Sequence, residues 1–348
     1  MIDKKLFEKI MKKKKELDKL RPFPKAALEE LKKQLEIELI YNSNAIEGNS
    51  LTLQETRLVL EHGITIKGKS LREHFEATNH KEAILFVEYS LKHEISEDDI
   101  KKLNELVLDK IYDEEKGRYR TTNVRILGAV KSPPQAEKVP NLMKNFIAYI
   151  IGNMDNLNII EMAAAMHYKF VEIHPFADGN GRTARLIMNL FLMKHGYPIT
   201  IVLRNDRKKY YQTLKEADKG DIKPFMDFIG YCINRSLDIY LSAFKKGLEY
   251  IPLSNAAKGT PYTQEYLSLL ARKGRLDAVK ISRNWMTTKK AVNEYIKNSK
   301  KSGNKKENKG KEILLKPVLP ITQAKGMLNG MEKKPTRVVI KEVKKGWK

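Results

Sequence analysis

The 348-residue sequence is poor in cysteine, in tryptophan and in long apolar runs. Its one cysteine, Cys232, excludes an intramolecular disulfide and a cysteine-based zinc site. No apolar run reaches the roughly 18 residues that a membrane-spanning helix needs. The N-terminus is rich in lysine and lacks the apolar core of a secretion signal. We therefore expect a soluble cytoplasmic protein that does not use a membrane as a partner.

Acidic residues are scarce in the last quarter of the chain. Residues 253–348 carry 24 basic and 7 acidic side chains, whereas residues 1–252 carry 42 and 36. Most of the net charge of +23 therefore lies in the C-terminal quarter. This concentration suggests contact with a polyanion, although a solvated basic tail is the commoner explanation of a lysine run.

The most constrained stretch is HPFADGNGRTAR, residues 174–185. An apolar helical run ends at Ile173, because Pro175 lacks a backbone donor and the following glycines favour a loop. A second apolar run, residues 186–193, has the spacing of a buried helix. The sequence therefore predicts a loop between two core helices, and the end of this loop forms the first turn of the second helix.

The composition of this loop suits a phosphate. Free N–H groups at a helix N-terminus, two glycines that allow close approach and two arginines together form an anion cradle. Next to them, His174 can accept a proton and Asp178 can hold a divalent cation. Positioning, charge neutralisation and a base are what phosphoryl or nucleotidyl transfer needs.

Residues 174–185 resemble the motif of the Fic family, H-x-F-x-[D/E]-G-N-G-R-x-x-R, and match it at every fixed position. Family members mostly transfer AMP from ATP to a hydroxyl on a target protein. The resemblance covers about residues 40–250. It implies a mainly α-helical bundle with a β-hairpin flap, ATP as substrate and Mg²⁺ or Mn²⁺ as cofactor.

The resemblance also implies roles for the matched residues. His174 would be the general base that takes the proton of the target hydroxyl, Phe176 would anchor the loop in the core, and Asp178 would be the metal ligand. The nucleotide-binding residues that it implies in the motif are Asp178, Gly179, Asn180, Gly181, Arg182, Thr183, Ala184 and Arg185. Of these, Arg182 and Arg185 would bind the outer phosphates, and the backbone from Gly179 to Gly181, with Asn180, would form the anion hole.

A second pattern precedes the core. A helix starting near Lys25 is predicted to end at Gly48, and Ser43 and Glu47 share one face of it. A surface serine and a capping glutamate would be the commoner interpretation of this segment alone. The pattern S-x-x-x-E-G-N, completed by Asn49, nevertheless resembles the inhibitory-helix motif of Fic proteins. This resemblance implies that Glu47 pairs with Arg185 and withholds it from the γ-phosphate, as bidentate arginine–carboxylate pairing would allow.

Two further segments complete the predicted site. Residues 117–130 alternate and contain β-branched side chains, which predicts a short hairpin. In the family this segment is the flap that pairs with the backbone of the target, here with its tip at residues 126–130. The resemblance adds further candidate nucleotide contacts, which are Leu127, Gly128, Ala129, Val130, Tyr210, Tyr211, Leu214 and Asp218. We expect His167 to be a buried structural histidine.

From Thr263 onward the sequence resembles a helix-turn-helix with a small wing, a winged-helix-like module often appended to Fic domains. We predict helices at 264–272, near Ala278 and at 289–296. Phosphate contacts to DNA are expected from Lys280, Arg283, Lys289 and Lys290. Protein binding or formation of a homodimer is the alternative for this module. The predicted segments are N-terminal helices 1–50, a Fic core 51–250, the module 261–298 and a basic, partly disordered tail 299–348.

Three functions remain open at this point. The first is an AMP transferase that is auto-inhibited through Glu47. The second is an enzyme of the same fold that transfers another nucleotide or phosphate-containing group, or that removes AMP. The third is a DNA-binding regulator in which the Fic domain senses a nucleotide.

Overall fold

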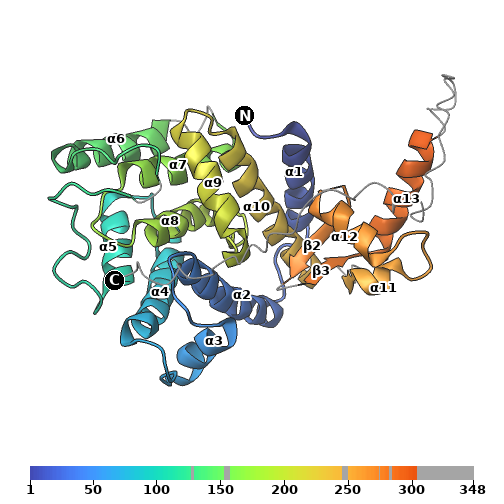
Figure 1. Cartoon of the computed structure of the whole chain (residues 1–348), viewed down its shortest axis with the longest axis horizontal. Coiled ribbons are helices and arrows are strands. Elements are labelled where there is room, and N and C mark those ends of the chain that lie inside the picture. Colours follow the sequence, from blue (N-terminus) through green and yellow to red (C-terminus); the bar gives the residue numbers. More distant parts are fainter. Residues whose placement is uncertain (127–128, 153–156, 245–249, 274, 282–283, 304–348) are drawn as a thin grey trace, which may run out of the picture. The chain divides into compact units, whose positions relative to one another are not determined.

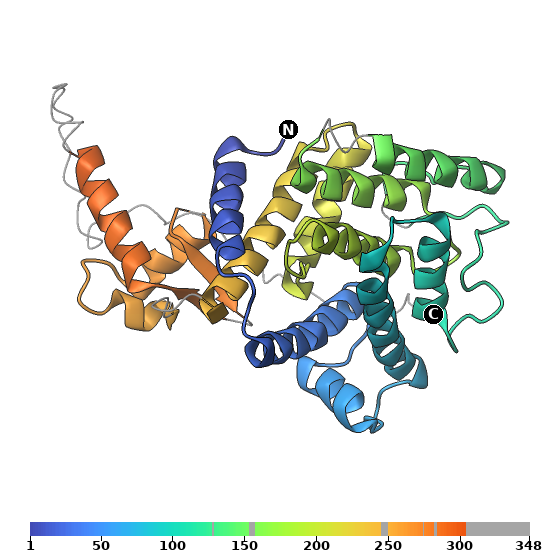
Figure 2. The same cartoon turned by 180° about the vertical axis from the view of Figure 1, so that it is seen from behind.

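The computed structural model of the chain describes residues 1–126, 129–152, 157–244, 250–273, 275–281 and 284–303. Residues Met1–Tyr295 form one compact unit, and the remainder from Ile296 forms a second. The first unit is mainly helical, as predicted, with a small sheet towards its C-terminal end (Figures 1 and 2). No helix within the described ranges has the length and apolar character needed to cross a membrane.

The helical body contains the helix predicted to start near Lys25 and the two core helices predicted on either side of the 174–185 loop. Its α-helices are α1 (Lys4–Asp18), α2 (Lys25–Ile46), α3 (Leu53–His62), α4 (Leu71–Tyr89), α5 (Glu97–Leu108), α6 (Val139–Gly152), α7 (Ile159–Ile173), α8 (Asn180–Lys194), α9 (Arg207–Asp218) and α10 (Lys223–Phe244). Three single 3₁₀ turns are η1 (Ser90–Lys92), η2 (Ala136–Lys138) and η3 (Arg204–Asp206).

Local sequence explains where several of these helices start. The side chains of Thr52, Ser70 and Ser96 each accept a hydrogen bond from the backbone N–H of the third residue of the helix that follows. The acidic side chain of that third residue accepts in return from the backbone N–H of the cap residue. Such capping boxes satisfy donors that the first helical turn leaves open. They fix the starts of α3, α4 and α5, and α4 is the helix that later contributes to the site.

Helix α8 lies in the middle of the helical body, where α2, α4, α5 and α7 all pack against it (Figure 1). Nearly every side chain from Arg182 to Leu192 is buried. Two arginines of the 174–185 motif are therefore held in the protein interior, where ionic and hydrogen-bonded contacts are stronger than in water. This environment distinguishes Arg182 and Arg185 from surface arginines.

The predicted hairpin at residues 117–130 is wrong for the part that the structure describes. No strand is present in 117–126 or 129–130, and Leu127 and Gly128 lie outside the described residues. The segment is instead a loop fixed by Arg120, whose N–H donates to the carbonyl of Pro175 (2.9 Å) and whose guanidinium donates to the carbonyl of Thr122 (3.0 Å). The alternating residues form no strand because none of the described residues beside this segment offers a strand to pair with it.

The C-terminal part of the first unit contains a three-stranded antiparallel sheet in the order β1-β3-β2. Its elements are β1 (Ile251–Pro252), α11 (Leu253–Ala257), α12 (Gln264–Arg272), β2 (Ala278–Ile281), β3 (Asn284–Thr287) and α13 (Lys289–Gly303), the last of which continues into the second unit. The short helix predicted near Ala278 is wrong, because Ala278 begins β2 and pairs with Thr287 of β3. α11 lies between the predicted Fic core and the predicted module.

The basic residues predicted to contact DNA are only partly described. Lys289 and Lys290 are exposed at the start of α13, and Lys280 belongs to β2. Arg283 and the tail 304–348 lie outside the described residues. DNA binding, the winged-helix assignment and the segment boundaries therefore stay predictions.

Candidate active site

The loop between α7 and α8 is held in one shape by its own residues. His174 ends α7 in the left-handed conformation (φ 50°), and Gly179 precedes α8 in the same region (φ 77°). The side chain of Asn180 donates to the carbonyl of Phe176 (2.8 Å) and accepts from its N–H (3.0 Å). Phe176 itself is fully buried. The Asn180 amide is thus used to close the loop, which leaves backbone groups to meet a ligand.

Arg120 fixes the backbone of His174 by a hydrogen bond. Its Nε donates to the His174 carbonyl (2.8 Å), and the side chain is almost completely buried. Burial is the main cause that lowers the pKa of His174, with the Arg120 charge acting in the same direction. The carbonyl of Val171 and the carboxylates of Glu47 and Asp178 oppose this shift. His174 is therefore held as a neutral imidazole, which can accept a proton, at neutral pH.

The predicted inhibitory motif contacts Arg185 through Ser43 and Glu47. The Arg185 Nη2 donates to Oε1 of Glu47 (2.7 Å) and to the carbonyl of Ser43 (2.9 Å), and its Nε donates to Oγ of Ser43 (2.9 Å). Arg185 is fully buried, whereas the Glu47 side chain keeps 29% of its surface exposed. The end of α2 and the start of α8, which are 138 residues apart in the chain, are joined by this ion pair.

Glycine at position 181 is what lets Glu47 come so close. A Cβ placed on Gly181 would overlap Oε1 of Glu47 and lie 3.3 Å from Nη1 of Arg185. The Glu47 carboxylate is therefore an internal anion at the first turn of α8, where open N–H groups and the helix dipole favour negative charge. Gly48, which follows it, has the left-handed φ of 110° that ends α2 sharply.

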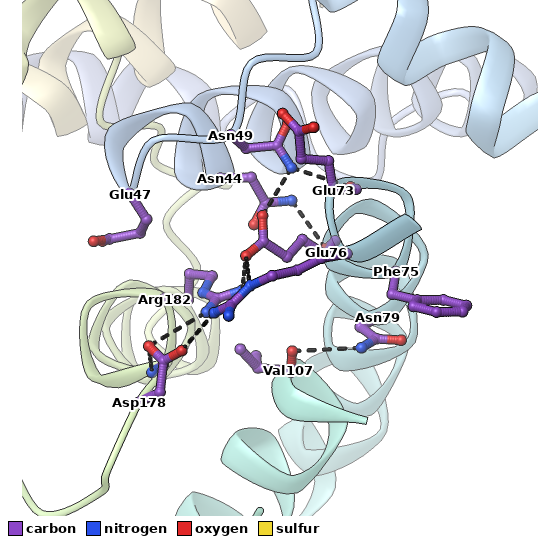
Figure 3. A network of polar contacts seen from close by, with 12 residues as sticks. Asn44, Glu47, Asn49, Glu73, Phe75, Glu76, Asn79, Val107, Asp178 and Arg182 are labelled. Carbon is purple, nitrogen blue, oxygen red and sulfur yellow. Dashed lines mark hydrogen bonds and ion pairs between the residues drawn. The ribbon is translucent and has the colours of Figure 1, made fainter. Parts of the chain in front are cut away.

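Asp178, the predicted metal ligand, is engaged by two arginines. Figure 3 shows it beside one of them, Arg182. Its Oδ2 accepts from Nη2 of Arg72 on α4 (2.8 Å), and its Oδ1 lies 3.7 Å from Nη2 of Arg182. Oδ1 also accepts from the N–H of Gly179 (2.6 Å). A second carboxylate, that of Glu76, comes from α4, and its Oε1 lies 3.4 Å from Nη1 of Arg182. The site therefore contains an alternating set of two acidic and two basic side chains.

Buried donors remain open beside this set. Within the part of the chain that the structure describes, Nη1 of Arg185 and Nε of Arg182 have no hydrogen-bond partner. Such unpaired buried donors are costly unless a ligand completes them. An anion with several oxygens at the start of α8 would do so.

The predicted site residues on α9 lie at different distances from the Glu47–Arg185 pair. Tyr211 is close to the site, because its hydroxyl donates to Oε2 of Glu47 (3.5 Å). Tyr210 is buried behind Arg185, with its hydroxyl 2.9 Å from Nε2 of His167. His167 is confirmed as a buried, hydrogen-bonded histidine. Asp218 accepts from the N–H of Val130 (3.3 Å) and so links α9 to the predicted flap.

Thr183 and Ala184 are fully buried on the inner side of α8, so a ligand would reach only their backbone. Leu214 is buried as well, whereas Ala129 is partly exposed and Val130 is exposed. The structure therefore brings His174, Asp178 and residues 179–185 together with Glu47. It leaves the predicted flap contacts at 127–128 undescribed.

Sequence reasoning missed four residues of the site, Arg72, Glu76, Arg120 and Asn104. The fully buried Asn104 donates to the Asp178 carbonyl (3.0 Å) and accepts from the N–H of Gly117 (3.1 Å). Arg72 and Glu76 are spaced i, i+4 on α4 and read as an ordinary surface pair. Only the placement of Glu76 among apolar positions of the helix signalled that it is largely buried.

The structure offers one carboxylate for a metal ion in this loop. In the described residues, no three His, Cys, Asp or Glu side chains come together as a preformed metal cluster. Asp178 stands at the mouth of the anion cradle with 39% of its side chain exposed. A Mg²⁺ ion commonly uses one or two carboxylates and fills its other positions with phosphate oxygens and water. The residues present fit a metal ion that arrives together with a phosphate ligand.

Comparison with known proteins agrees with this geometry. Residues 94–192 match the Fic/DOC family. A protein named protein adenylyltransferase Fic from Nematostella vectensis is 40% identical over 248 residues, which span 70% of this chain and 57% of that protein. The chain thus spans little more than half the length of this relative.

Two solved structures share the fold. A Fic domain containing signaling protein from Bacteroides thetaiotaomicron is 30% identical, with a TM-score of 0.64 over 68% of this chain and 97% of that one. Fic-1 from C. elegans is 35% identical, with a TM-score of 0.63 over 69% of this chain and 72% of that one. The family match at residues 94–192 includes the whole of the 174–185 loop and the helix α7 before it.

Proposed function

This chain belongs to the Fic/DOC family, and on that premise we propose that it is a protein adenylyltransferase, which transfers AMP from ATP to a hydroxyl of a protein target. The observation that carries the proposal is the loop at residues 174–185. A neutral His174, the open first turn of α8 and two buried arginines with unpaired donors converge there. The name of the Nematostella vectensis relative, which shares 40% identity, supports it.

In the proposed reaction, His174 takes the proton of the target hydroxyl as that oxygen attacks the α-phosphorus of ATP. The bond between the α-phosphorus and the oxygen bridging to the β-phosphate breaks, and pyrophosphate leaves with the electron pair. The N–H groups of Asn180 and Gly181 and the guanidinium groups of Arg182 and Arg185 hold the phosphates in line. The target hydroxyl belongs to a protein that docks along residues 126–130, where main-chain pairing would read backbone rather than side chains.

Asp178 would hold the Mg²⁺ or Mn²⁺ ion that accompanies ATP. The metal supplies charge neutralisation of the phosphates when bound. The protein's own contribution is to aim one carboxylate at the phosphate cradle. That aim is set by the Gly179 N–H, which donates to Oδ1, and by Asn104, which holds the Asp178 carbonyl.

The direct test is to compare ATP labelled at the α-phosphate with ATP labelled at the γ-phosphate, in a lysate supplied with the purified protein and Mg²⁺. We expect label from the α-position to appear on protein, in an acid-stable bond, only when the purified protein is added, and label from the γ-position to stay at the level of lysate without it. An increase of label from the γ-position alone on adding the protein would identify a phosphotransferase and contradict the proposal. A His174→Ala variant should lose the α-label. His62→Ala, which changes an exposed histidine on α3, is its matched control.

Asp178→Ala is expected to remove the metal dependence of nucleotide binding. The apparent affinity for ATP in Mg²⁺ should fall by on the order of tenfold or more, because a hard cation loses its one protein carboxylate. In EDTA the same variant should bind ATP no worse than the wild-type protein, since a negative charge has been removed. Isothermal titration in both buffers measures this, and an unchanged affinity in Mg²⁺ would place the metal site elsewhere.

Two other functions predicted from the sequence stay predictions, namely removal of AMP and nucleic-acid binding. Removal of AMP would use the Glu47 carboxylate, at the first turn of α8, to orient a water molecule. Nucleic-acid binding by residues 253–348 would rest on the net charge of +17 in that segment, and affinity for duplex DNA should then fall steeply with salt. Neither has the convergence of side chains that favours AMP transfer.

A further inference from the structure

We propose that Arg72 is a second inhibitory contact, which keeps Asp178 from a metal-bound nucleotide while Glu47 keeps Arg185 from it, and that Glu76 links the two contacts. The proposal rests on the proposed function, because it concerns the same nucleotide site. It assigns to α4 a regulatory role that the 174–185 motif does not contain.

The first observation is that Arg72 occupies the carboxylate that a metal ion would need. Nη2 of Arg72 donates to Oδ2 of Asp178 at 2.8 Å, while Oδ1 accepts from Gly179. Each oxygen of Asp178 is therefore already satisfied, one of them by a full positive charge. A divalent cation at Oδ2 would have to displace this guanidinium, since two cations on one oxygen repel each other.

The second observation is that this contact can open. The Arg72 side chain keeps 57% of its surface exposed and Asp178 keeps 39%. Ion pairs of this exposure contribute little net stability, because both partners are well hydrated when apart. Arg72 therefore behaves as a removable cap, unlike the fully buried Arg185.

The third observation is that Glu76 holds Arg72 and Arg182 together. Oε1 of Glu76 lies 3.4 Å from Nε of Arg72 and 3.4 Å from Nη1 of Arg182. The Glu76 side chain is only 11% exposed, so its charge acts on both arginines with little screening. The position of Glu76 thus determines where the Arg72 guanidinium rests relative to Asp178.

The inhibitory segment in turn positions Glu76. Nδ2 of Asn49 donates to Oε2 of Glu76 (2.8 Å) and to the carbonyl of Glu73 (3.0 Å), and Nδ2 of Asn44 donates to the Glu76 carbonyl (2.9 Å). Figure 3 shows Glu76 between these two asparagines and Arg182. Asn44 and Asn49 flank Glu47 at the end of α2. A displacement of this segment that releases Arg185 therefore also withdraws a support of Glu76, and with it the hold on Arg72.

The test measures metal binding and not catalysis. The 348-residue chain is saturated with ATP, and free Mn²⁺ is followed by electron paramagnetic resonance. Arg72→Ala should bind Mn²⁺ about two- to fivefold more tightly than the wild-type protein, the range expected when an exposed ion pair is removed. Arg72→Gln, which keeps the aliphatic stem, should act in the same direction. Arg272→Ala is the matched control, because that guanidinium bonds Ser268 within α12.

The link is tested by combining Arg72→Ala with Glu47→Gly. Because Glu47→Gly removes the ion pair that holds the end of this segment against Arg185, Glu76 loses part of its support, and the gain from Arg72→Ala should shrink by at least about twofold in the combined variant. Equal gains in both backgrounds would overturn the link through Glu76. Unchanged Mn²⁺ affinity in Arg72→Ala would overturn the inhibitory role, and weaker affinity would identify Arg72 as a phosphate ligand instead.

These outcomes separate the proposal from the function on which it rests. If Mn²⁺ affinity rises as expected but no variant transfers label from ATP to protein, the adenylyltransferase proposal fails and the role of Arg72 stands. If label is transferred and the Mn²⁺ affinity of Arg72→Ala equals that of the wild-type protein, the inhibitory role of Arg72 fails and the adenylyltransferase proposal stands. If ATP and Mn²⁺ bind to none of the variants, both proposals fail.

Discussion

Glu47→Gly is expected to raise the transfer of AMP to the protein itself and to its targets, by on the order of 100-fold, because correct placement of the reacting phosphorus is most of the catalysis in such transfers. In the structure, Oε1 of Glu47 lies 2.7 Å from Nη2 of Arg185 and stands beside Gly181. Removing the carboxylate frees Arg185 and the first turn of α8 for phosphates. Position 47 is the C-cap of α2, so glycine there costs less helix stability than it would inside the helix. Incorporation of α-labelled AMP measures the effect.

Two variants separate specific competition from a general loosening of α2. Glu30→Gly places glycine at an exposed position inside α2, at a cost of about 1 kcal/mol of helix stability, and leaves Glu47 in place. It should not activate the enzyme. The double variant Glu47→Gly with Arg185→Ala should remain inactive, since the released arginine is missing. Activation of Glu30→Gly, or of the double variant, would refute the competition for Arg185. Thermal unfolding checks that the buried Arg185 site still folds.

His174→Ala is expected to abolish transfer, with a loss of roughly 10²–10⁴ in rate, the usual contribution of a general base. The variant should be made in the Glu47→Gly background, where the activity to be lost is large. ATP binding should stay nearly intact, because the anion contacts come from residues 179–185. An unchanged rate would assign the base elsewhere. Loss of ATP binding would instead show that His174 shapes the loop, as its left-handed φ of 50° at the end of α7 permits.

The pH profile gives an independent check on His174. Burial lowers the pKa of His174 below the ordinary value near 6.5, so the neutral base persists in mildly acidic solution. The rate should therefore fall only as the pH drops through this depressed pKa, with its midpoint below 6.5. Glu47 is one of the carboxylates that raise the pKa of His174, so Glu47→Gly should move the midpoint further down. A midpoint above 6.5 would argue against His174 as the titrating base.

The sequence by itself determined the helical body and the identity of its central loop. Apolar periodicity located α7 and α8, and Pro175 with the glycines located the break between them, because these signals act within a few residues of the chain. The pattern of Ser43 and Glu47 identified the segment that meets Arg185. A pattern of residue types is enough to identify a site where the chemistry of the ligand demands those types at a fixed local spacing.

Local patterns were misleading where a partner strand decides the outcome. Residues 117–126 alternate like a strand and form none, whereas Ala278 was expected in a helix and pairs with Thr287. A strand is stable only when a neighbour completes its backbone hydrogen bonds and covers one face. The presence of that neighbour is a property of the folded chain, and β2 has one in β3.

Only the tertiary structure decided which ordinary polar residues serve the site. Arg72 is 106 residues from Asp178 in the chain, and Arg120 is 54 residues from His174. Arginines and glutamates on a helix are usually solvated, and their own neighbours in sequence do not distinguish the few that are not. Packing of α4 and the 117–126 loop against α8 and its preceding loop brings these side chains together. Burial strengthens the charges of Arg120 and Glu76 by removing water, and Arg72, which stays exposed, joins the network from its surface side through Glu76 and Asp178.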